Sequence, residues 1–197
     1  MVNVAVLVSG GGTNLQAIID AKAAGKLPDV RLALVVASTP KAYALERAKA
    51  AGIEGCVLRK EKGEDPALYG QRLLALLKAH DIQLVVLAGF LTILPENVIH
   101  AYDHRILNIH PSLIPSFCGD GFYGLHVHEA VLKRGVKVTG ATVHFVNEIT
   151  DGGDIIAQKA VDVLPGDTPE TLQRRVMEQA EWLLLPMAVQ QVAASIQ

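Results

Sequence analysis

The 197-residue chain has few cysteines and no large excess of charge of either sign. Its two cysteines, Cys56 and Cys118, lie far apart in unlike contexts, which favours free thiols in a reducing cytoplasm over a disulfide framework. Eighteen basic and twenty acidic residues give a net charge of −2, and the basic residues form no run. This balance argues against a nucleic-acid partner and against a polybasic membrane contact, since both need concentrated positive charge.

The chain also lacks a hydrophobic run that could span a bilayer. Its longest apolar run, residues 84–94, is too short and is interrupted by Gly89 and Thr92. Met1 leads directly into an apolar, strand-like run, without the basic segment and cleavage site of a signal peptide. These absences predict a soluble cytoplasmic protein with no membrane partner, and the length predicts one domain over residues 1–197.

Apolar runs rich in β-branched residues alternate with helical patterns through the first half of the chain. The runs predict strands at residues 2–8, 31–37, 55–58, 84–87 and 105–109. The helical patterns predict helices at residues 14–24, 43–51, 66–80 and 95–102. Most of the strands are apolar on both faces, as parallel strands are when helices cover them. The alternation predicts an α/β fold with a Rossmann-like, mostly parallel sheet flanked by helices.

The pattern changes after Gly135. Residues 137–147 and 155–163 predict two longer strands joined by a Gly-rich connection, which would add antiparallel strands to the sheet near the C-terminus. A final helix is expected to begin at residues 167–169, where an N-cap side chain precedes a proline. Pro186 is expected to kink or break this helix at the residue before it.

Residues 107–115 contain the polar pair around which the rest of the chain is organised. Asn108 and His110 lie where a predicted strand is stopped by prolines, and alternate strand residues share a face. An amide and an imidazole placed together there can stabilise a developing oxyanion and move a proton. For an isolated Asn-x-His pair the alternative is structural, with Asn108 capping a turn and His110 filling a polar niche.

Residues 9–14, Ser-Gly-Gly-Gly-Thr-Asn, lie between the first strand and the first helix. Glycines permit a tight turn there, and the free N–H groups of a helix N-terminus form an anion site. A dinucleotide site would need Gly or Ala at Leu15 and an acidic residue after the second strand, and a P-loop would need Gly-Lys-Ser/Thr. The loop therefore predicts a small phosphate monoester, helped by Thr13 and Asn14, with a tight turn without ligand as the alternative.

Three further polar positions bear on this site. Asp151, in the Gly-rich connection, can reach His110 if the loops converge at the carboxyl edge of the sheet, and a carboxylate there favours a protonated imidazole. The alternative is an ordinary turn aspartate. His144 is a secondary candidate at the rim, with a satisfied half-buried histidine as its alternative. His126 and His128 lack the Cys, Asp or Glu cluster that would complete a coordination shell, so no metal is predicted.

Residues 9–18, 87–94, 108–115 and 143–153 together resemble phosphoribosylglycinamide formyltransferase, the folate-dependent enzyme of purine synthesis. The resemblance covers essentially the whole chain in the correct order and implies the formyltransferase fold. Asn-x-His-Pro-Ser-Leu with a later Asp is shared by the wider formyltransferase superfamily. The Ser-Gly-x-Gly-Thr-Asn loop is the part that points to a ribonucleotide substrate.

The resemblance implies transfer of a formyl group from 10-formyltetrahydrofolate, as co-substrate, to the amine of N1-(5-phospho-D-ribosyl)glycinamide in de novo purine biosynthesis. Asn108 and protonated His110 would stabilise the oxyanion, and Asp151 would hold and charge His110. The residues implied for the ribonucleotide are Gly12, Thr13 and Asn14 at the phosphate and Glu181 at the ribose. Those implied for the folate are Leu91, Thr92, Ile93, Leu94, Asn147, Glu148, Ile149, Thr150 and Asp151. Both partners are small molecules, no metal is needed, and the chain is expected to be a monomer or homodimer.

The chain departs from the family pattern at several places. Residues 117–124 form a longer loop than in the shortest relatives, and residues 175–181 are longer by one residue than the usual spacing. Thr92 stands where many relatives have arginine, and Pro66 where some place a folate-contacting arginine. The alternative functions are a formyltetrahydrofolate deformylase with water as acceptor, another folate-dependent formyltransferase, or a non-enzymatic phosphate sensor.

Overall fold

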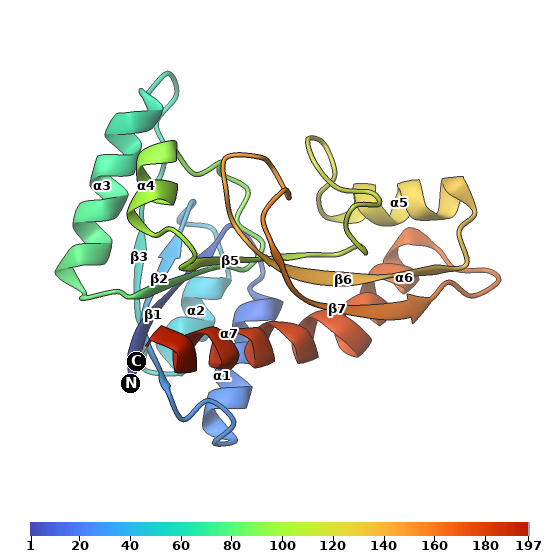
Figure 1. Ribbon diagram of the computed structural model, residues 1–197, viewed down its shortest axis with the longest axis horizontal. Coiled ribbons are helices and arrows are strands. Elements are labelled where there is room, and N and C mark those ends of the chain that lie inside the picture. The colour runs from blue at the N-terminus through green and yellow to red at the C-terminus, as the bar shows by residue number, and fades with distance from the viewer. Residues whose placement is uncertain (197) are drawn as a thin grey trace.

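The computed structural model describes residues 1–196 and shows a seven-stranded sheet between two layers of helices (Figure 1). The strands are β1 (Val2–Val8), β2 (Val30–Ala37), β3 (Glu54–Val57), β4 (Leu84–Leu87), β5 (Ile106–His110), β6 (Val138–Phe145) and β7 (Ile155–Asp162). The helices are α1 (Thr13–Ala23), α2 (Ala44–Ala50), α3 (Pro66–Ala79), α4 (Glu96–Ala101), α5 (Leu125–Arg134), α6 (Pro169–Val176), the π-helical η1 (Met177–Glu181) and α7 (Trp182–Ile196).

The strand order is β3-β2-β1-β4-β5-β6-β7. Strands β1 to β5 pair in parallel, and β6 and β7 are added antiparallel. This arrangement confirms the predicted fold class. Strands β1 and β4 are neighbours, but the chain continues from β1 to α1 on one face of the sheet and from β4 to α4 on the other. This pair is the switch point of the sheet. Ligands of such sheets bind in the crevice at the switch point, beyond the carboxyl ends of the strands.

Both faces of β1 are buried, which explains its apolar sequence. Val4 and Val6 pack in the core shared with α1 and α7, whereas Ala5 and Leu7 pack in the core shared with α3 and α4. Figure 1 shows these helices on opposite sides of the sheet. None of the helices within residues 1–196 is both long and apolar enough to cross a membrane.

Helix α5 is an element for which the sequence analysis gave no range. It follows Gly124 and ends at Gly135, which takes the left-handed conformation with φ 76° and ψ 23°. Its buried residues are Val127, His128 and Val131. His126 and His128 lie in the first turns of this helix. His126 is exposed, whereas His128 is fully buried and neither of its ring nitrogens has a hydrogen-bonding partner within residues 1–196.

Of the predicted kink or break at Pro186, the break is wrong, because α7 continues through Pro186 to Ile196. A proline ring clashes with the carbonyl group of the residue four positions earlier. That residue is Trp182, and its ψ of −11° tilts this carbonyl away from the regular helical direction. The irregular geometry therefore lies before Pro186, where η1 joins α6 to α7.

Candidate active site

The central cluster of the site is built by two neighbouring strands and one connection. Strand β5 carries Asn108 and His110 on the same face, and the antiparallel register places His144 of β6 directly opposite Asn108. Asp151 enters from the connection between β6 and β7. Its φ of 55° is in the left-handed region, which aspartate tolerates better than most residues. An oxygen of its carboxylate lies 3.5 Å from His110 Nδ1, and the other lies 3.5 Å from His144 Nε2.

His144 fixes the orientation of the Asn108 amide. His144 Nδ1 lies 2.7 Å from the Phe145 carbonyl oxygen, which can only accept, so Nδ1 carries the proton. Nε2 lies 3.1 Å from Asn108 Nδ2, an amide nitrogen that can only donate, so Nε2 is the acceptor of this bond. The second N–H of Asn108 has only a long contact of 3.5 Å to Asp151, which holds it weakly. That N–H is therefore available to a ligand, and His144 belongs to the cluster rather than to its rim.

The electrostatics of His110 differ from the sequence-based expectation. Its Nε2 donates to the Phe117 carbonyl oxygen at 2.9 Å, and its Nδ1 faces the Asp151 carboxylate. Burial lowers the pKa of His110 and outweighs the opposing effects of the Asp151 charge and the Phe117 carbonyl, so the net pKa lies below its ordinary value. Asp151 therefore raises the pKa of His110 as expected, but burial has the larger effect.

Asp151 is held as a carboxylate. Burial by itself raises its pKa, but the contact with His144, the charge of His110 and the Gly119 N–H hold it below the ordinary value. The Gly119 N–H donates to Oδ2 at 2.8 Å. Gly153 lets the connection come this close, because a Cβ there would collide with the Phe145 carbonyl group.

This cluster opens into a cavity of about 400 Å³, within the range of small-molecule sites. Its lining includes Asn108, His110, His144 and every residue that the family resemblance implied for the folate. Residues 119–124, which the sequence analysis noted only as a long loop, form another wall. At the mouth, the apolar side chains of Leu91, Ile93 and Ile149 are largely exposed. The cavity can therefore take a flat, partly apolar ring against the polar cluster.

Residues 9–14, called the Gly loop below, lie next to this cavity but do not line it. Gly12 is the N-cap of α1 with φ 72° and ψ 32°, and a Cβ there would lie 2.6 Å from the Cβ of Ala44. No side chain caps α1, and its first turn contains no acidic residue. The first N–H groups of a helix have no intrahelical acceptor, so this turn can bind an anion. None of the four residues predicted for the ribonucleotide lines the cavity: these are Gly12, Thr13, Asn14 and Glu181.

Ser9 joins the Gly loop to the cavity, a role that the sequence did not indicate. Its N–H donates to the Gly89 carbonyl at 3.1 Å, and its hydroxyl oxygen accepts from the Leu91 N–H at 2.9 Å. The Ser38 hydroxyl also donates to it at 2.7 Å. The loops that follow β1 and β4 are thereby tied together at the switch point of the sheet.

Asn14 and Glu181 meet behind the Gly loop. Asn14 Nδ2 donates to Glu181 Oε2 at 2.7 Å, whereas Asn14 Oδ1 is buried without a partner within residues 1–196. Burial raises the pKa of Glu181 to about 7, and the Asn14 N–H only partly opposes this. The π-helical turn η1 ends at Glu181. A π-helical turn contains one residue more than an α-helical turn, so it accommodates the extra residue expected within residues 175–181. Glu181 thus reaches Asn14 despite the longer spacing.

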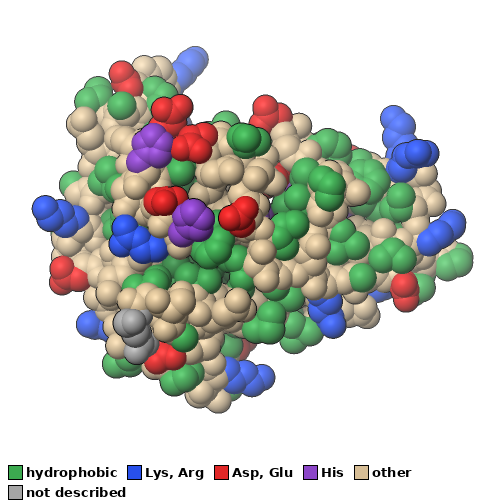
Figure 2. All heavy atoms as spheres, viewed as in Figure 1, with side chains coloured by type: hydrophobic (Ala, Val, Ile, Leu, Met, Phe, Trp, Pro, Cys, Tyr) green, Lys and Arg blue, Asp and Glu red, His purple; other side chains and the backbone are tan. Residues whose placement is uncertain are grey.

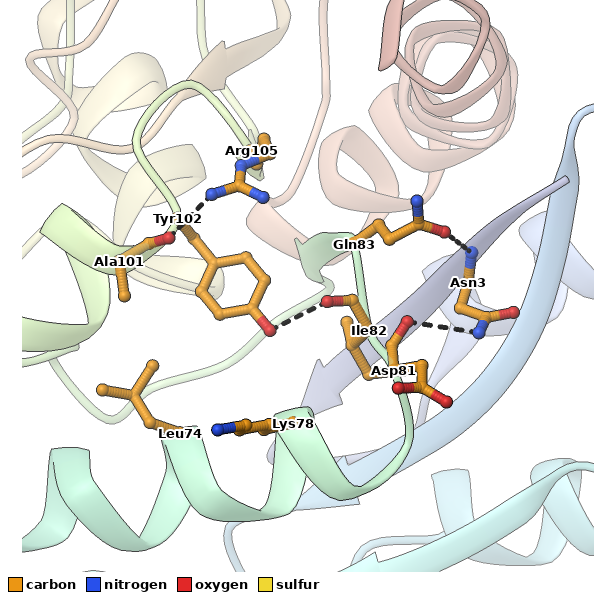
Figure 3. A pocket seen from close by; sticks show the side chains of 9 residues that line it. All are labelled: Asn3, Leu74, Lys78, Asp81, Ile82, Gln83, Ala101, Tyr102 and Arg105. Carbon is orange, nitrogen blue, oxygen red and sulfur yellow. Dashed lines mark hydrogen bonds between the residues drawn. The ribbon is translucent and has the colours of Figure 1, made fainter. Parts of the chain in front are cut away.

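A second cavity, of about 580 Å³, lies at the opposite edge of the sheet (Figure 3). Its polar groups bond to nearby parts of the chain: Asn3 to the Asp81 carbonyl, Tyr102 to the Ile82 carbonyl and Arg105 to the Ala101 carbonyl. The residues that line it are Asn3, Leu74, Lys78, Asp81, Ile82, Gln83, Ala101, Tyr102 and Arg105. This cavity lies apart from the cluster of Asn108, His110 and Asp151 and shares no lining residue with the first cavity.

Two further histidines, His100 and His104, lie at the surface. Figure 2 shows histidine and acidic side chains gathered on the face over α4 and the β6–β7 connection. His100 pairs with Glu148 at 2.7 Å, and His104 pairs with Asp103 at 2.9 Å. All four side chains are largely exposed, so these contacts are surface pairs of little energetic weight.

The sheet and its crevice define a Rossmann-like α/β protein with a buried cluster of Asn108, His110 and Asp151 beside its cavity. The family model for formyl transferase matches residues 2–189. The chain is 41% identical over 176 residues to the chloroplastic phosphoribosylglycinamide formyltransferase of Arabidopsis thaliana, covering 89% of this chain and 60% of that protein. It is 37% identical to the Bacillus subtilis phosphoribosylglycinamide formyltransferase, covering 87% of this chain and 85% of that one.

Among solved structures, glycinamide ribonucleotide transformylase 1 from Symbiobacterium toebii superposes with a TM-score of 0.92 at 40% identity, covering 99% of this chain and 89% of that chain. The chain belongs to the formyl transferase family, among the phosphoribosylglycinamide formyltransferases.

Proposed function

We propose that the protein transfers the formyl group of 10-formyltetrahydrofolate to the amine of N1-(5-phospho-D-ribosyl)glycinamide, a step of purine biosynthesis. The observation that carries this proposal is the cluster of Asn108, His110 and Asp151 at the base of the cavity. Membership of the family supports the same chemistry. The reaction would take place in the cytoplasm between two small molecules, without a metal, in a monomer or homodimer.

In the proposed reaction the ribonucleotide amine attacks the formyl carbon, and the formyl oxygen becomes an oxyanion. The free N–H of Asn108 and Nε2–H of His110 are the donors for this oxyanion, provided that substrate displaces the Phe117 carbonyl from His110. The bond between the formyl carbon and N10 then breaks, and its electron pair stays on N10. The amine loses one proton and N10 gains one, which His110 is placed to carry. Asp151 stabilises the imidazolium during this transfer.

The two substrates occupy neighbouring sites in this proposal. The pterin ring lies in the cavity against residues 91–94 and 147–151. The phosphate binds the N–H groups at Gly12, Thr13 and Asn14, and the ribose hydroxyls meet Glu181 and the unpartnered oxygen of Asn14. The amine then points from the Gly loop toward Asn108, across the link that Ser9 makes between the loops.

A three-part assay tests the proposal. Purified protein receives 10-formyltetrahydrofolate alone, then with glycinamide ribonucleotide, then with its dephosphorylated analogue, and formylated product is measured together with tetrahydrofolate. We expect transfer with the ribonucleotide, little with the analogue because the binding energy of the phosphate is lost, and at most slow hydrolysis without acceptor. Rapid folate turnover that the ribonucleotide leaves unchanged would instead indicate a deformylase.

A further inference from the structure

Arg47 is a basic residue beside the Gly loop that neither the sequence motifs nor the proposed mechanism uses. It lies on α2, and its half-buried side chain reaches across to the loop between β1 and α1. Arg47 Nε donates to the Gly11 carbonyl oxygen at 2.8 Å, and Nη1 donates to Gln16 Oε1 at 3.0 Å. The guanidinium also lies over the ring of Tyr43, with its carbon 5.2 Å from the ring centroid.

These hydrogen bonds fix the position of the guanidinium, but they do not neutralise its positive charge. Both acceptors, the Gly11 carbonyl and the Gln16 amide, are neutral oxygens. The Gln16 amide is itself held by Asp20 at 2.8 Å, so its oxygen stays turned toward Arg47. Arg47 is also close to the N-cap, because its Cδ would lie 3.4 Å from a Cβ built on Gly12.

The Arg47 guanidinium extends from the last turn of α2, where a cation is favoured, to the N-terminus of α1, where an anion is favoured. The N-terminus of a helix carries a partial positive charge, so the residues preferred there are acidic. Helix α1 has neither a capping side chain nor an acidic residue in its first turn, and the chain places Arg47 there instead. An anion bound at the N-terminus of α1 would reverse this repulsion, since it would attract the helix terminus and the guanidinium together.

An independent observation at the same helix end also indicates a ligand. The Asn14 side chain is 9% exposed, and its Oδ1 has no hydrogen-bonding partner within residues 1–196. A buried amide oxygen without a partner costs free energy that a ligand hydroxyl can recover. A ligand that combines an anionic group with hydroxyl donors satisfies both Arg47 and Asn14.

We propose that Arg47 is the specificity-determining residue of this site, where its guanidinium recognises the dianionic phosphate monoester of the acceptor. The backbone N–H groups of the loop would hold the phosphate oxygens in place, and Arg47 would supply the full positive charge that they lack. Arginine suits this task because its planar fork binds the phosphate while other edges remain bonded to the protein. This inference rests on the proposed function in that the acceptor is a phosphorylated ribonucleotide.

The proposal is tested by changing residue 47 in the protein and the phosphate group in the acceptor, separately and together. Wild type, Arg47→Met and Arg47→Lys are each assayed with glycinamide ribonucleotide and with its dephosphorylated analogue, at enzyme concentrations that make the slow reaction measurable. We expect Arg47→Met to raise KM for the ribonucleotide about ten- to a hundredfold, the effect of losing a charge-assisted hydrogen bond. The kcat, the KM for 10-formyltetrahydrofolate and all constants for the analogue should stay as in wild type. Arg47→Lys should recover part of the loss.

Matched controls separate charge from packing. Lys49→Met removes the same charge from the exposed surface of α2 and should leave the ribonucleotide KM unchanged. Arg47→Gln removes the charge but keeps a donor for the Gly11 carbonyl, so it decides the question if Arg47→Met folds poorly. Equal losses with both acceptors would show that Arg47 only holds the loop in place, and the proposal would fail.

A binding measurement keeps this result distinct from the proposed function. Calorimetry with inorganic phosphate compares wild type with Arg47→Gln without any formyl transfer. Weaker phosphate binding by Arg47→Gln would support the role of Arg47 even if the wild-type protein proved inactive as a transferase. Equal phosphate binding by both proteins would overturn that role while leaving the transferase assignment to its own assay.

Discussion

Asn108, His110, His144 and Asp151 are paired with one another or with the backbone, whereas several polar groups around the Gly loop have no partner within residues 1–196. In the first region, His110, His144 and Asp151 contact one another or neighbouring backbone groups. In the second, α1 has no side-chain cap, and the buried Asn14 Oδ1 has no partner within residues 1–196. The cluster is therefore organised before a ligand arrives, as catalysis by fixed dipoles requires. The Gly loop is completed only by what it binds.

This difference separates two kinds of experimental effect. Changes within the cluster should act mainly on turnover, because they alter interactions made in the transition state. Changes around the Gly loop should act on affinity and on the stability of the ligand-free protein.

The largest expected effect is that of Asn108→Ala. The variant loses the N–H that is available for the oxyanion, and losing one such donor lowers turnover by about 10²–10³. Both KM values should change much less. Steady-state kinetics measure this, with Asn3→Ala at the opposite edge of the sheet as the control that keeps wild-type turnover. A normal kcat in Asn108→Ala would remove the amide from the mechanism.

Asp151→Asn tests how the cluster is charged. The Asp151 carboxylate raises the pKa of His110 against the larger, opposite effect of burial, so its removal should lower that pKa further. Steps that need the imidazolium should then be lost at a lower pH than in wild type.

An NMR titration of His110 in both proteins measures this shift directly. Asp154→Asn is the matched control, since it makes the same charge change at an exposed position of the same connection. Coincident midpoints for wild type and Asp151→Asn would show that burial alone sets the pKa of His110.

Glu181→Gln tests the region around the Gly loop in the absence of ligand. Because burial raises the folded-state pKa of Glu181 to about 7, the folded protein keeps a proton that the unfolded chain releases near the ordinary carboxyl pKa. Stability should therefore fall as pH rises through the window between these values, and stay reduced above it. Glutamine cannot ionise, so the variant should lack this loss.

Thermal unfolding of both proteins across the range of about pH 5 to 8 gives the comparison. We expect the Tm of Glu181→Gln to rise relative to wild type by several degrees toward the alkaline end. Glu178→Gln, on the same turn but ion-paired with Arg174 at the surface, serves as the control. Parallel Tm curves for Glu181→Gln and wild type would mean that Glu181 is ionised in the fold at no cost.

The sequence predicted the cluster better than the region around the Gly loop, for a physical reason. Parallel strands covered on both faces must be apolar, so the polar residues at the end of β5 were conspicuous in an otherwise buried run. Asn108 and His110 share a face through the period of the strand alone. Asp151 required in addition that the connection between the antiparallel strands β6 and β7 fold back to the same rim.

The remaining features depend on tertiary packing that no local pattern encodes. Arg47 meets the Gly loop because α2 packs beside α1, although α2 resembles any short charged helix in the sequence. The net pKa of His110 depends on how deeply the fold buries it, and the path of α7 through Pro186 depends on the turn at Trp182. The assignment of residues 1–197 to one domain stays a prediction.

The smallest expected effect is also the one that joins the two regions. Ser9→Ala removes the acceptor for the Leu91 N–H, and with it the bond between the Gly loop and the wall of the cavity. Losing one neutral hydrogen bond costs about 0.5–1.5 kcal/mol, which corresponds to about a two- to tenfold change in affinity. If Ser9 holds both loops in register, KM should rise by similar factors for the ribonucleotide and for 10-formyltetrahydrofolate, with kcat nearly constant. Ser38→Ala removes only the other partner of the Ser9 hydroxyl and should have less effect on either KM. A rise in one KM alone would show that the two regions bind their ligands independently and that the link between them is only structural.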